Sequence, residues 1–266
     1  TTGYSLKPGR RLDLEVTFDA RPSDDLSIKV ARLNIYSTDP NQPGITIGLR
    51  GLPLTGRGES NEPALQEVLD TFGLPINVGD DTPTEYRLGT PNANSQEVTV
   101  QSMVKAGDGP VSIRPLAVFG TDNGPAARVG FYTPGLAESK QQLWYVPRES
   151  SQSVNPIVYG QTLIEPGDKP FALFAEFPGF TNPTGQQRFV YSEDALNKIW
   201  EPSTNPNNLR KMRFYPFVDQ FGNAAPNTYV VAVEEYTADY DYQDVVFIVS
   251  KDRKSTRLNS SHTIQS

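Results

Sequence analysis

Short runs of β-branched and aromatic residues, each bounded by turn-forming residues, recur along most of this chain. Examples are the segments 29–36, 111–119, 171–177 and 245–249. Stretches such as Gly-Asp-Gly-Pro and Thr-Asp-Asn-Gly-Pro separate them, because Gly tolerates positive φ and Pro fixes φ in turns. Strands at such short intervals, with almost no helical pattern between them, are typical of antiparallel β-sandwiches. The sequence therefore predicts an all-β fold.

The predicted strands form two groups, separated by a linker at 51–61 that contains Gly, Pro and small polar residues. The first group comprises 12–18, 29–36 and 45–49, and the second comprises 98–103, 111–119, 127–132, 142–146, 171–177, 210–217, 228–233 and 245–249. We expect two tandem antiparallel β-sandwich domains, immunoglobulin-like or jelly-roll-like. The first domain, residues 1–59, is expected to be truncated, and the second spans 60–251.

One segment, 62–72, has the periodicity of a short amphipathic helix. Leu65, Val68, Leu69 and Phe72 are spaced i, i+3, i+4 and i+7, which places them on one helical face. Asn61 is the predicted N-cap, and a Gly follows the last apolar residue. We expect this helix to pack against one end of the second sandwich.

The last segment of the chain, 252–266, differs in composition from the rest. It is basic, polar and without periodicity, and it reads like an in-frame translation of a sequencing-library adapter. An ordinary disordered basic tail is the alternative. We expect a disordered, non-native tail and exclude it from the prediction of the fold.

Composition excludes several classes of function. The chain has no Cys, and its single His, His262, lies in the excluded tail. This argues against His-dependent triads, Cys nucleophiles, disulfides and zinc sites of the usual type, and we predict no catalytic residues. The formal net charge of −7 argues against a nucleic-acid partner, for which a basic patch is expected. No apolar run approaches the roughly 18 to 20 residues of a membrane span.

The densest acidic cluster lies between the apolar runs 229–233 and 245–249. Its members are Glu234, Glu235, Asp239, Asp241 and Asp244. Like charges at the end of a hairpin repel one another unless a cation neutralises them. Ca²⁺ does so with roughly six to eight oxygen ligands from carboxylates, carbonyls and water. The cluster therefore predicts a Ca²⁺ site.

Successive side chains of an extended chain point to opposite sides, and this alternation ranks the five candidate ligands. Asp239 and Asp241 are two residues apart and lie on one side, whereas Asp244 joins them only if the chain turns before the next strand. Glu235 is the preferred fourth ligand, and Glu234 is the less favoured fifth candidate.

An EF-hand is excluded, because position six of such a loop would be Asp and position twelve would be Ser. In the alternative interpretation, the carboxylates cap strands or pair with Arg210, Lys211 and Arg213.

The N-terminal part resembles a known module. It carries P-G at 8–9, V-x-F at 16–18, L-x-I-x-S-T-D-P-x-x-P at 33–43 and L-x-G at 49–51. These motifs are similar to immunoglobulin-like modules of the ASH/HYDIN type, called choice-of-anchor D regions in bacteria. The resemblance implies a spacer or interaction module and no catalyst.

The C-terminal part resembles a second family. It carries F-A-L-F-A at 171–175, Y-S-E-D-A-L-N at 191–197, R-F-Y-P at 213–216, V-E-E at 233–235 and D-x-D-Y-x-D-V-V-F at 239–247. This order is similar to a bacterial domain family of unknown function that ends in G-D-x-D-Y-N-D-V-V. The family occurs in exported, surface-anchored or matrix-associated proteins. Gln243 stands where the family has Asn, and the Gly-rich run before Asp239 is short.

These observations lead to an expectation for function with two alternatives. We expect a non-enzymatic extracellular β-module of a bacterial surface or matrix protein, stabilised by Ca²⁺ and serving adhesion, display or spacing. Its partner would be a surface polysaccharide or another protein. We also expect the chain to be a fragment, so that a signal peptide would lie outside it.

The first alternative is a carbohydrate-binding module with Trp144, Tyr145 and Trp200 as stacking platforms. The second is a glycoside hydrolase that uses two of the carboxylates.

Overall fold

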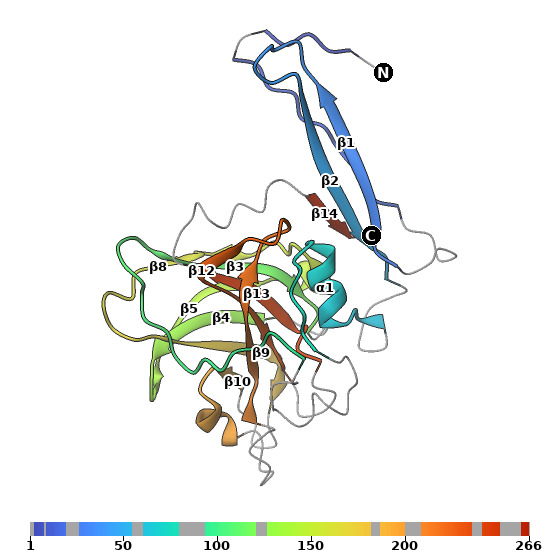
Figure 1. Cartoon of the computed structure of the whole chain (residues 1–266). Coiled ribbons are helices and arrows are strands. Elements are labelled where there is room, and N and C mark those ends of the chain that lie inside the picture. The colour runs from blue at the N-terminus through green and yellow to red at the C-terminus, as the bar shows by residue number, and fades with distance from the viewer. Residues whose placement is uncertain are drawn as a thin grey trace.

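The computed structural model in Figure 1 shows a β-rich body from which one hairpin projects. It describes residues 3–7, 9–19, 27–54, 61–79, 94–120, 127–181, 187–199, 209–235, 241–250 and 262–265. The all-β prediction is confirmed, since strands dominate these residues and α1 is the one α-helix among them.

The body is a sandwich of two sheets. The larger sheet has the order β11-β12-β13-β3-β6, with β8 also paired to β3. Its strands are β3 (Val111–Val118), β6 (Ser153–Val154), β8 (Leu163–Ile164), β11 (Met212–Val218), β12 (Ala224–Val233) and β13 (Val245–Ser250).

The smaller sheet has the order β10-β9-β4-β5-β7. Its strands are β4 (Ala127–Thr133), β5 (Leu136–Val146), β7 (Tyr159–Gly160), β9 (Ala172–Thr181) and β10 (Gln187–Tyr191). The 3₁₀ helices η2 (Arg148–Ser150) and η3 (Asp194–Ile199) lie in connections.

A continuous apolar core lies between the two sheets. Phe214, Val231 and Phe247 of the larger sheet pack there with Val129 and Trp144 of the smaller sheet. The Trp144 ring meets Phe247 edge to face, with 6.1 Å between the centroids. Its indole Nε1–H donates to the carbonyl of Ile113 at 3.0 Å, which satisfies the one polar atom of a fully buried side chain. This bond also ties the two sheets together.

The larger sheet is buried on its other face as well. Helix α1 (Leu65–Thr71) and the segment that follows it cover this face, and Val68 and Leu69 pack against Val230 and Ile248. As a result, every residue of β13 is buried. A strand covered on both faces is apolar throughout, which explains the uninterrupted run 245–249.

Helix α1 begins later than its sequence pattern predicts. The N-cap is Ala64, whose backbone N–H donates to the Glu67 carboxylate at 2.9 Å, so the prediction of Asn61 as N-cap is wrong. The Glu67 side chain thus satisfies the N–H of the N-cap residue, as the third helical residue does in a capping box. The C-terminal prediction is confirmed, because Gly73 has φ +68° and its N–H donates to the carbonyl of Asp70.

The N-terminal part forms a separate hairpin. Strands β1 (Lys29–Tyr36) and β2 (Gly44–Leu52) pair antiparallel, and the turn between them is held by an Asn41 N–H bond to the Asp39 carboxylate at 2.8 Å. Most of both strands is exposed, and only the end of β2 reaches the core beneath α1.

Two expectations for this hairpin differ from the structure. Residues 12–18 form no strand, and Leu12 and Leu14 are exposed, because no second sheet in the described residues covers them. Strand β14 (His262–Gln265) pairs parallel with β2, so these four residues of the expected disordered tail are extended.

Residues 98–103 also differ from the prediction of a strand. Only two isolated bridges form there, Val98 with Phe214 and Met103 with Phe171. The segment therefore crosses between the two sheets at its ends instead of joining either ladder.

In the part of the chain that the structure describes, no helix is long and apolar enough to cross a membrane.

The packing of α1 generates a prediction about stability. Leu69 is fully buried on the face of α1 that packs against the larger sheet, so Leu69→Ala should lower the free energy of unfolding by about 2–5 kcal/mol. Val30 on β1 is 67 % exposed, so Val30→Ala should change it by less than about 0.5 kcal/mol. Urea denaturation of both variants measures this. Equal effects of the two substitutions would contradict the packing described here.

Candidate metal site

The acidic hairpin lies at one end of the larger sheet. Strands β12 and β13 are antiparallel neighbours, with Ala232 opposite Val246. The residue after β12 and the residue before β13, Glu234 and Asp244, therefore reach the same end of the sheet. Gln243 continues this arrangement through a parallel bridge to Val233. The strand pairing thus brings together carboxylates that are ten residues apart in the sequence.

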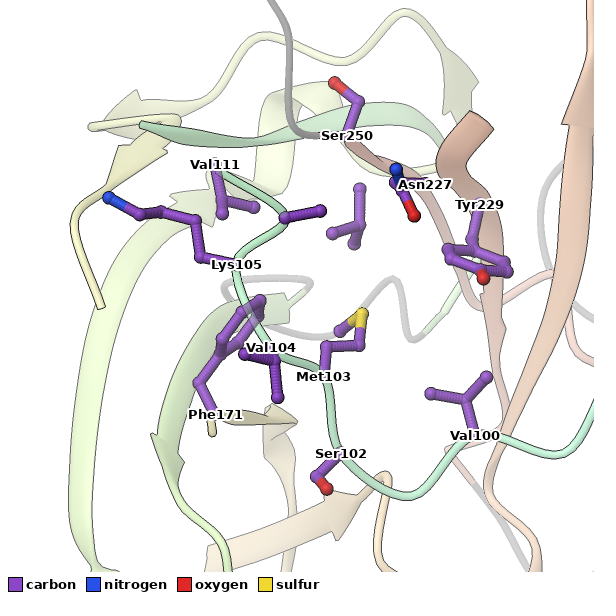
Figure 2. Close-up of a pocket in the computed structure, with 12 residues that line it drawn as sticks. Val100, Ser102, Met103, Val104, Lys105, Val111, Phe171, Asn227, Tyr229 and Ser250 are labelled. Atoms are coloured by element: carbon purple, nitrogen blue, oxygen red, sulfur yellow. The ribbon is translucent and has the colours of Figure 1, made fainter. Parts of the chain in front are cut away.

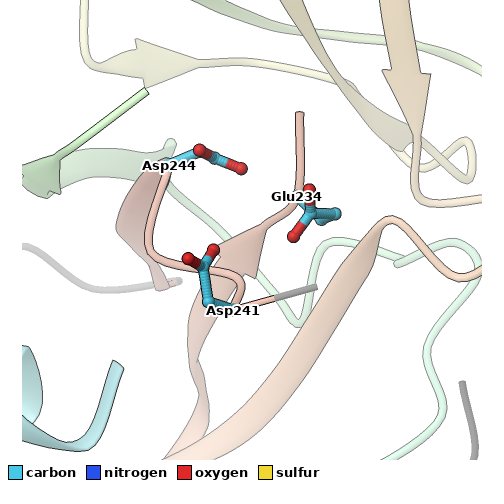
Figure 3. Close-up of side chains that lie close together, drawn as sticks. All are labelled: Glu234, Asp241 and Asp244. Carbon is cyan, nitrogen blue, oxygen red and sulfur yellow. The ribbon is translucent and has the colours of Figure 1, made fainter. Parts of the chain in front are cut away.

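Three carboxylates converge at this point. Glu234, Asp241 and Asp244 each offer an oxygen atom, and these oxygens lie within 4.8 Å of one another. Figure 3 shows the three side chains directed toward a common space. Glu234 and Asp244 are only 2 % and 5 % exposed, while Asp241 is partly exposed. The cluster has the oxygen ligands and the spacing that a hard cation requires.

The chain turns at Tyr242, as the ligand prediction requires. Tyr242 has φ +60°, a left-handed conformation that is uncommon outside Gly. Its ring is fully buried, and its hydroxyl donates to the carbonyl of Arg210 at 2.6 Å. The Arg213 guanidinium lies 4.4 Å from the ring centroid, a cation–π contact. These contacts hold a turn that places Asp241 and Asp244 on the same side.

Glu234 occupies the position that the sequence analysis assigned to Glu235. The Glu235 carboxylate is not one of the three whose oxygens lie within 4.8 Å of one another, although its charge repels Asp244. It lies near Gly120, where a Cβ atom would come within 2.7 Å of Glu235 Oε2. The Glu235 backbone N–H donates to the Asp244 carboxylate. Glu235 therefore contributes its backbone to the site, and Glu234 contributes its side chain. The fifth predicted ligand, Asp239, lies outside the described residues.

Burial and neighbouring charge raise the pKa of Asp244 well above its ordinary value. Desolvation is the largest cause, followed by repulsion from Glu235, Glu234 and Asp241. The hydrogen bond from the Glu235 N–H opposes this rise in pKa only partly. The ionised form is therefore unfavourable unless a positive charge compensates it.

A polar network beside the cluster escaped the sequence analysis. The Gln243 amide nitrogen donates to Asp241 Oδ2 at 2.7 Å and to Glu62 Oε2 at 3.2 Å. Gln152 donates to the other oxygen of Glu62 at 2.6 Å. Glu62 lies in the segment before α1, far from the hairpin in sequence, so only the folded chain reveals the contact.

The nearby arginines form ion pairs with two acidic residues outside the hairpin. Arg213 pairs with Glu97 at 2.9 Å, and Arg210 pairs with Glu97 at 3.4 Å and with Asp194 at 3.3 Å. Lys211 is buried, and its carbonyl accepts the Glu234 N–H at 3.0 Å. Glu97 was not among the predicted residues, because no local pattern connects it to the strand at 210–217.

The structure describes two of the three aromatic residues proposed as carbohydrate platforms, Trp144 and Tyr145. Trp144 is fully buried between the sheets, so its prediction as a platform is wrong. Tyr145 is partly exposed and packs on Tyr159, with 5.5 Å between the ring centroids and 33° between the planes. Trp200 lies outside the described residues.

A small cavity lies at the opposite end of the sandwich (Figure 2). It has a volume of about 210 Å³, and Met103, Phe171 and Tyr229 are among the residues that line it. Lys105 at its rim pairs with Glu165 at 3.1 Å. The cavity is smaller than the roughly 300–1,000 Å³ of typical ligand sites. We assign it no function.

Comparisons of the chain with protein-family models, with curated proteins and with solved structures find no match. The two family resemblances therefore stay predictions, and the interpretation of the site rests on its geometry.

The raised pKa of Asp244 generates a prediction about pH. A carboxyl group whose folded-state pKa exceeds its unfolded value binds more protons in the folded state, so its contribution to stability is lost as pH rises. In metal-free buffer, the free energy of unfolding should fall as pH rises from the ordinary carboxyl value of 3.8 toward neutrality. Asp244→Asn should flatten this dependence and stabilise the metal-free protein at pH 7.

Denaturation in EDTA across this pH range measures the effect. Asp108→Asn is the control, because Asp108 is exposed in the turn before β3, at the other end of that strand. A wild-type pH dependence in Asp244→Asn would contradict the electrostatic description of the site.

Proposed function

We propose that this chain is a non-catalytic β-sandwich module whose acidic hairpin binds Ca²⁺. The observation that carries the proposal is the convergence of Glu234, Asp241 and Asp244 within 4.8 Å, with two of the three buried. Buried like charges destabilise a fold unless they are neutralised. A bound cation supplies that neutralisation and turns the repulsion into stabilisation of the folded state.

The chemistry of the ligands favours Ca²⁺ over other common ions. The candidate ligands are all oxygen atoms, whereas Zn²⁺ and most transition metals favour His and Cys. Mg²⁺ requires near-octahedral geometry and retains several waters. Ca²⁺ accepts irregular sets of carboxylates and amide oxygens, which suits ligands held by two strand ends and one turn.

We further propose that the module acts in adhesion, display or spacing at a bacterial cell surface or matrix. The resemblance of its C-terminal part to exported domains motivates this placement. Extracellular Ca²⁺ modules bind the ion with Kd values of about 10⁻⁴–10⁻³ M, an affinity that a small carboxylate cluster reaches.

The geometry of the cluster favours a structural role over hydrolysis. A glycoside hydrolase needs two carboxyl groups that face a substrate cleft. Glu234 and Asp244 are nearly inaccessible, and the cavity described above lies at the other end of the sandwich. For the carbohydrate-binding alternative, the burial of Trp144 removes one of the three proposed platforms.

Calcium titration tests the proposal. Isothermal titration should give a heat of binding for wild type, and Ca²⁺ at 100 times Kd should stabilise the fold by about 2.7 kcal/mol. For a domain of this size, this corresponds to a rise in Tm of roughly 5–10 °C relative to EDTA. Glu234→Gln preserves the side-chain shape and removes the charge, so it should abolish most of both effects.

Asp108→Asn serves as the charge-matched control and should retain the wild-type response. A wild type that shows neither heat of binding nor a shift in Tm would overturn the proposal.

A further inference from the structure

We infer that the ion site includes two further ligands, the side-chain oxygen of Gln243 and the carboxylate of Glu62. A single Ca²⁺ then joins the acidic hairpin to the segment that leads into α1. This inference rests on the proposed Ca²⁺ binding and adds residues to it.

The buried oxygen of Gln243 is the first observation. Gln243 is 1 % exposed, and its Oε1 has no hydrogen-bond partner, although its Nε2 donates to two carboxylates. Buried amide oxygens are almost always satisfied, so an orphan needs an explanation. The oxygen and nitrogen of one amide are about 2.3 Å apart. Because Nε2 lies 2.7 Å from Asp241 Oδ2, the Gln243 amide borders the carboxylate cluster.

The position of the Gln243 nitrogen is the second observation. It lies between Asp241 Oδ2 and Glu62 Oε2, at 2.7 Å and 3.2 Å. A half-turn of the amide exchanges its nitrogen and oxygen with little change in shape. In the ion-bound state we infer this turned orientation, in which the oxygen that is unsatisfied in the present one lies beside the two carboxylates and faces the cation. Carboxylates and amide carbonyls are the groups that Ca²⁺ accepts.

Glu62 extends the site to a distant segment. Its other oxygen, Oε1, accepts from Gln152 Nε2, which also donates to the Phe119 carbonyl. Gln152 is buried, so this contact holds the Glu62 side chain toward the hairpin. With Glu234, Asp241 and Asp244, the two additional groups approach the roughly six to eight oxygens of a Ca²⁺ shell, and water completes it.

This ligand set has a consequence for α1. Glu62 lies two residues before Ala64, the N-cap of the helix that covers the larger sheet. An ion held by Glu62 and the hairpin fixes the start of α1 to that sheet. Ca²⁺ should therefore slow local opening of the helix in addition to stabilising the hairpin.

Two substitutions in the full chain test the ligand set by Ca²⁺ titration. Gln243→Met keeps the length of the side chain and removes the oxygen, and Glu62→Gln removes one charge. Each should weaken Ca²⁺ binding by about tenfold or more, because affinity follows the number and charge of the ligands. Gln243→Glu retains an oxygen at this position, so it should bind Ca²⁺ at least as tightly as wild type while lowering Tm in EDTA.

Hydrogen exchange supplies a second measurement. Ca²⁺ should increase the protection of the α1 amides in wild type and in Asp108→Asn, and much less in Glu62→Gln.

Loss of Ca²⁺ affinity in Glu234→Gln, with wild-type affinity in both Gln243→Met and Glu62→Gln, would overturn this inference alone. A wild type that binds no Ca²⁺ would overturn the proposed function together with it. If Gln243→Met does not fold, a weaker affinity of Gln243→Glu than of wild type contradicts the role of the oxygen.

Discussion

The antiparallel pairing of β12 with β13 is the constraint on which the rest of the structure depends. These strands form the centre of a sheet that is covered on one face by the second sheet and on the other by α1. Every residue of β13 and the last four residues of β12 are buried, so the strand register is firmly set. The ends of the two strands therefore hold Glu234 and Asp244 close together whether or not that proximity is favourable.

The electrostatic property of the site follows from this packing. Apolar burial stabilises the strands, and their ends bring carboxylates into a region where desolvation opposes ionisation. The Glu235 N–H donates to Asp244, and the Gln243 amide donates to Asp241. Both of these donors are neutral. In our proposal a cation completes the arrangement, and the hairpin and α1 become parts of one ion-dependent structure.

The sequence indicated most strands and the acidic hairpin, because β-branched runs and clustered carboxylates are local signals. It preferred Glu235 to Glu234, whereas the converging group contains Glu234. Both faces of β12 are buried over its last four residues, so no alternation of polar and apolar residues marks the two faces there. Glu62 and Glu97 reach their partners only through long-range packing. Residues 12–18 alternate like a strand and form none, since a strand also needs a partner and a covering layer.

The central claim is that a cation occupies the space among Glu234, Asp241 and Asp244. A crystal structure of the full chain grown with Ca²⁺, with an anomalous difference map, tests it most directly. The account predicts an anomalous peak at this position, with oxygens of the three carboxylates about 2.3–2.6 Å away. A map with no peak there, and carboxylates linked instead by a shared proton or a water molecule, would contradict it.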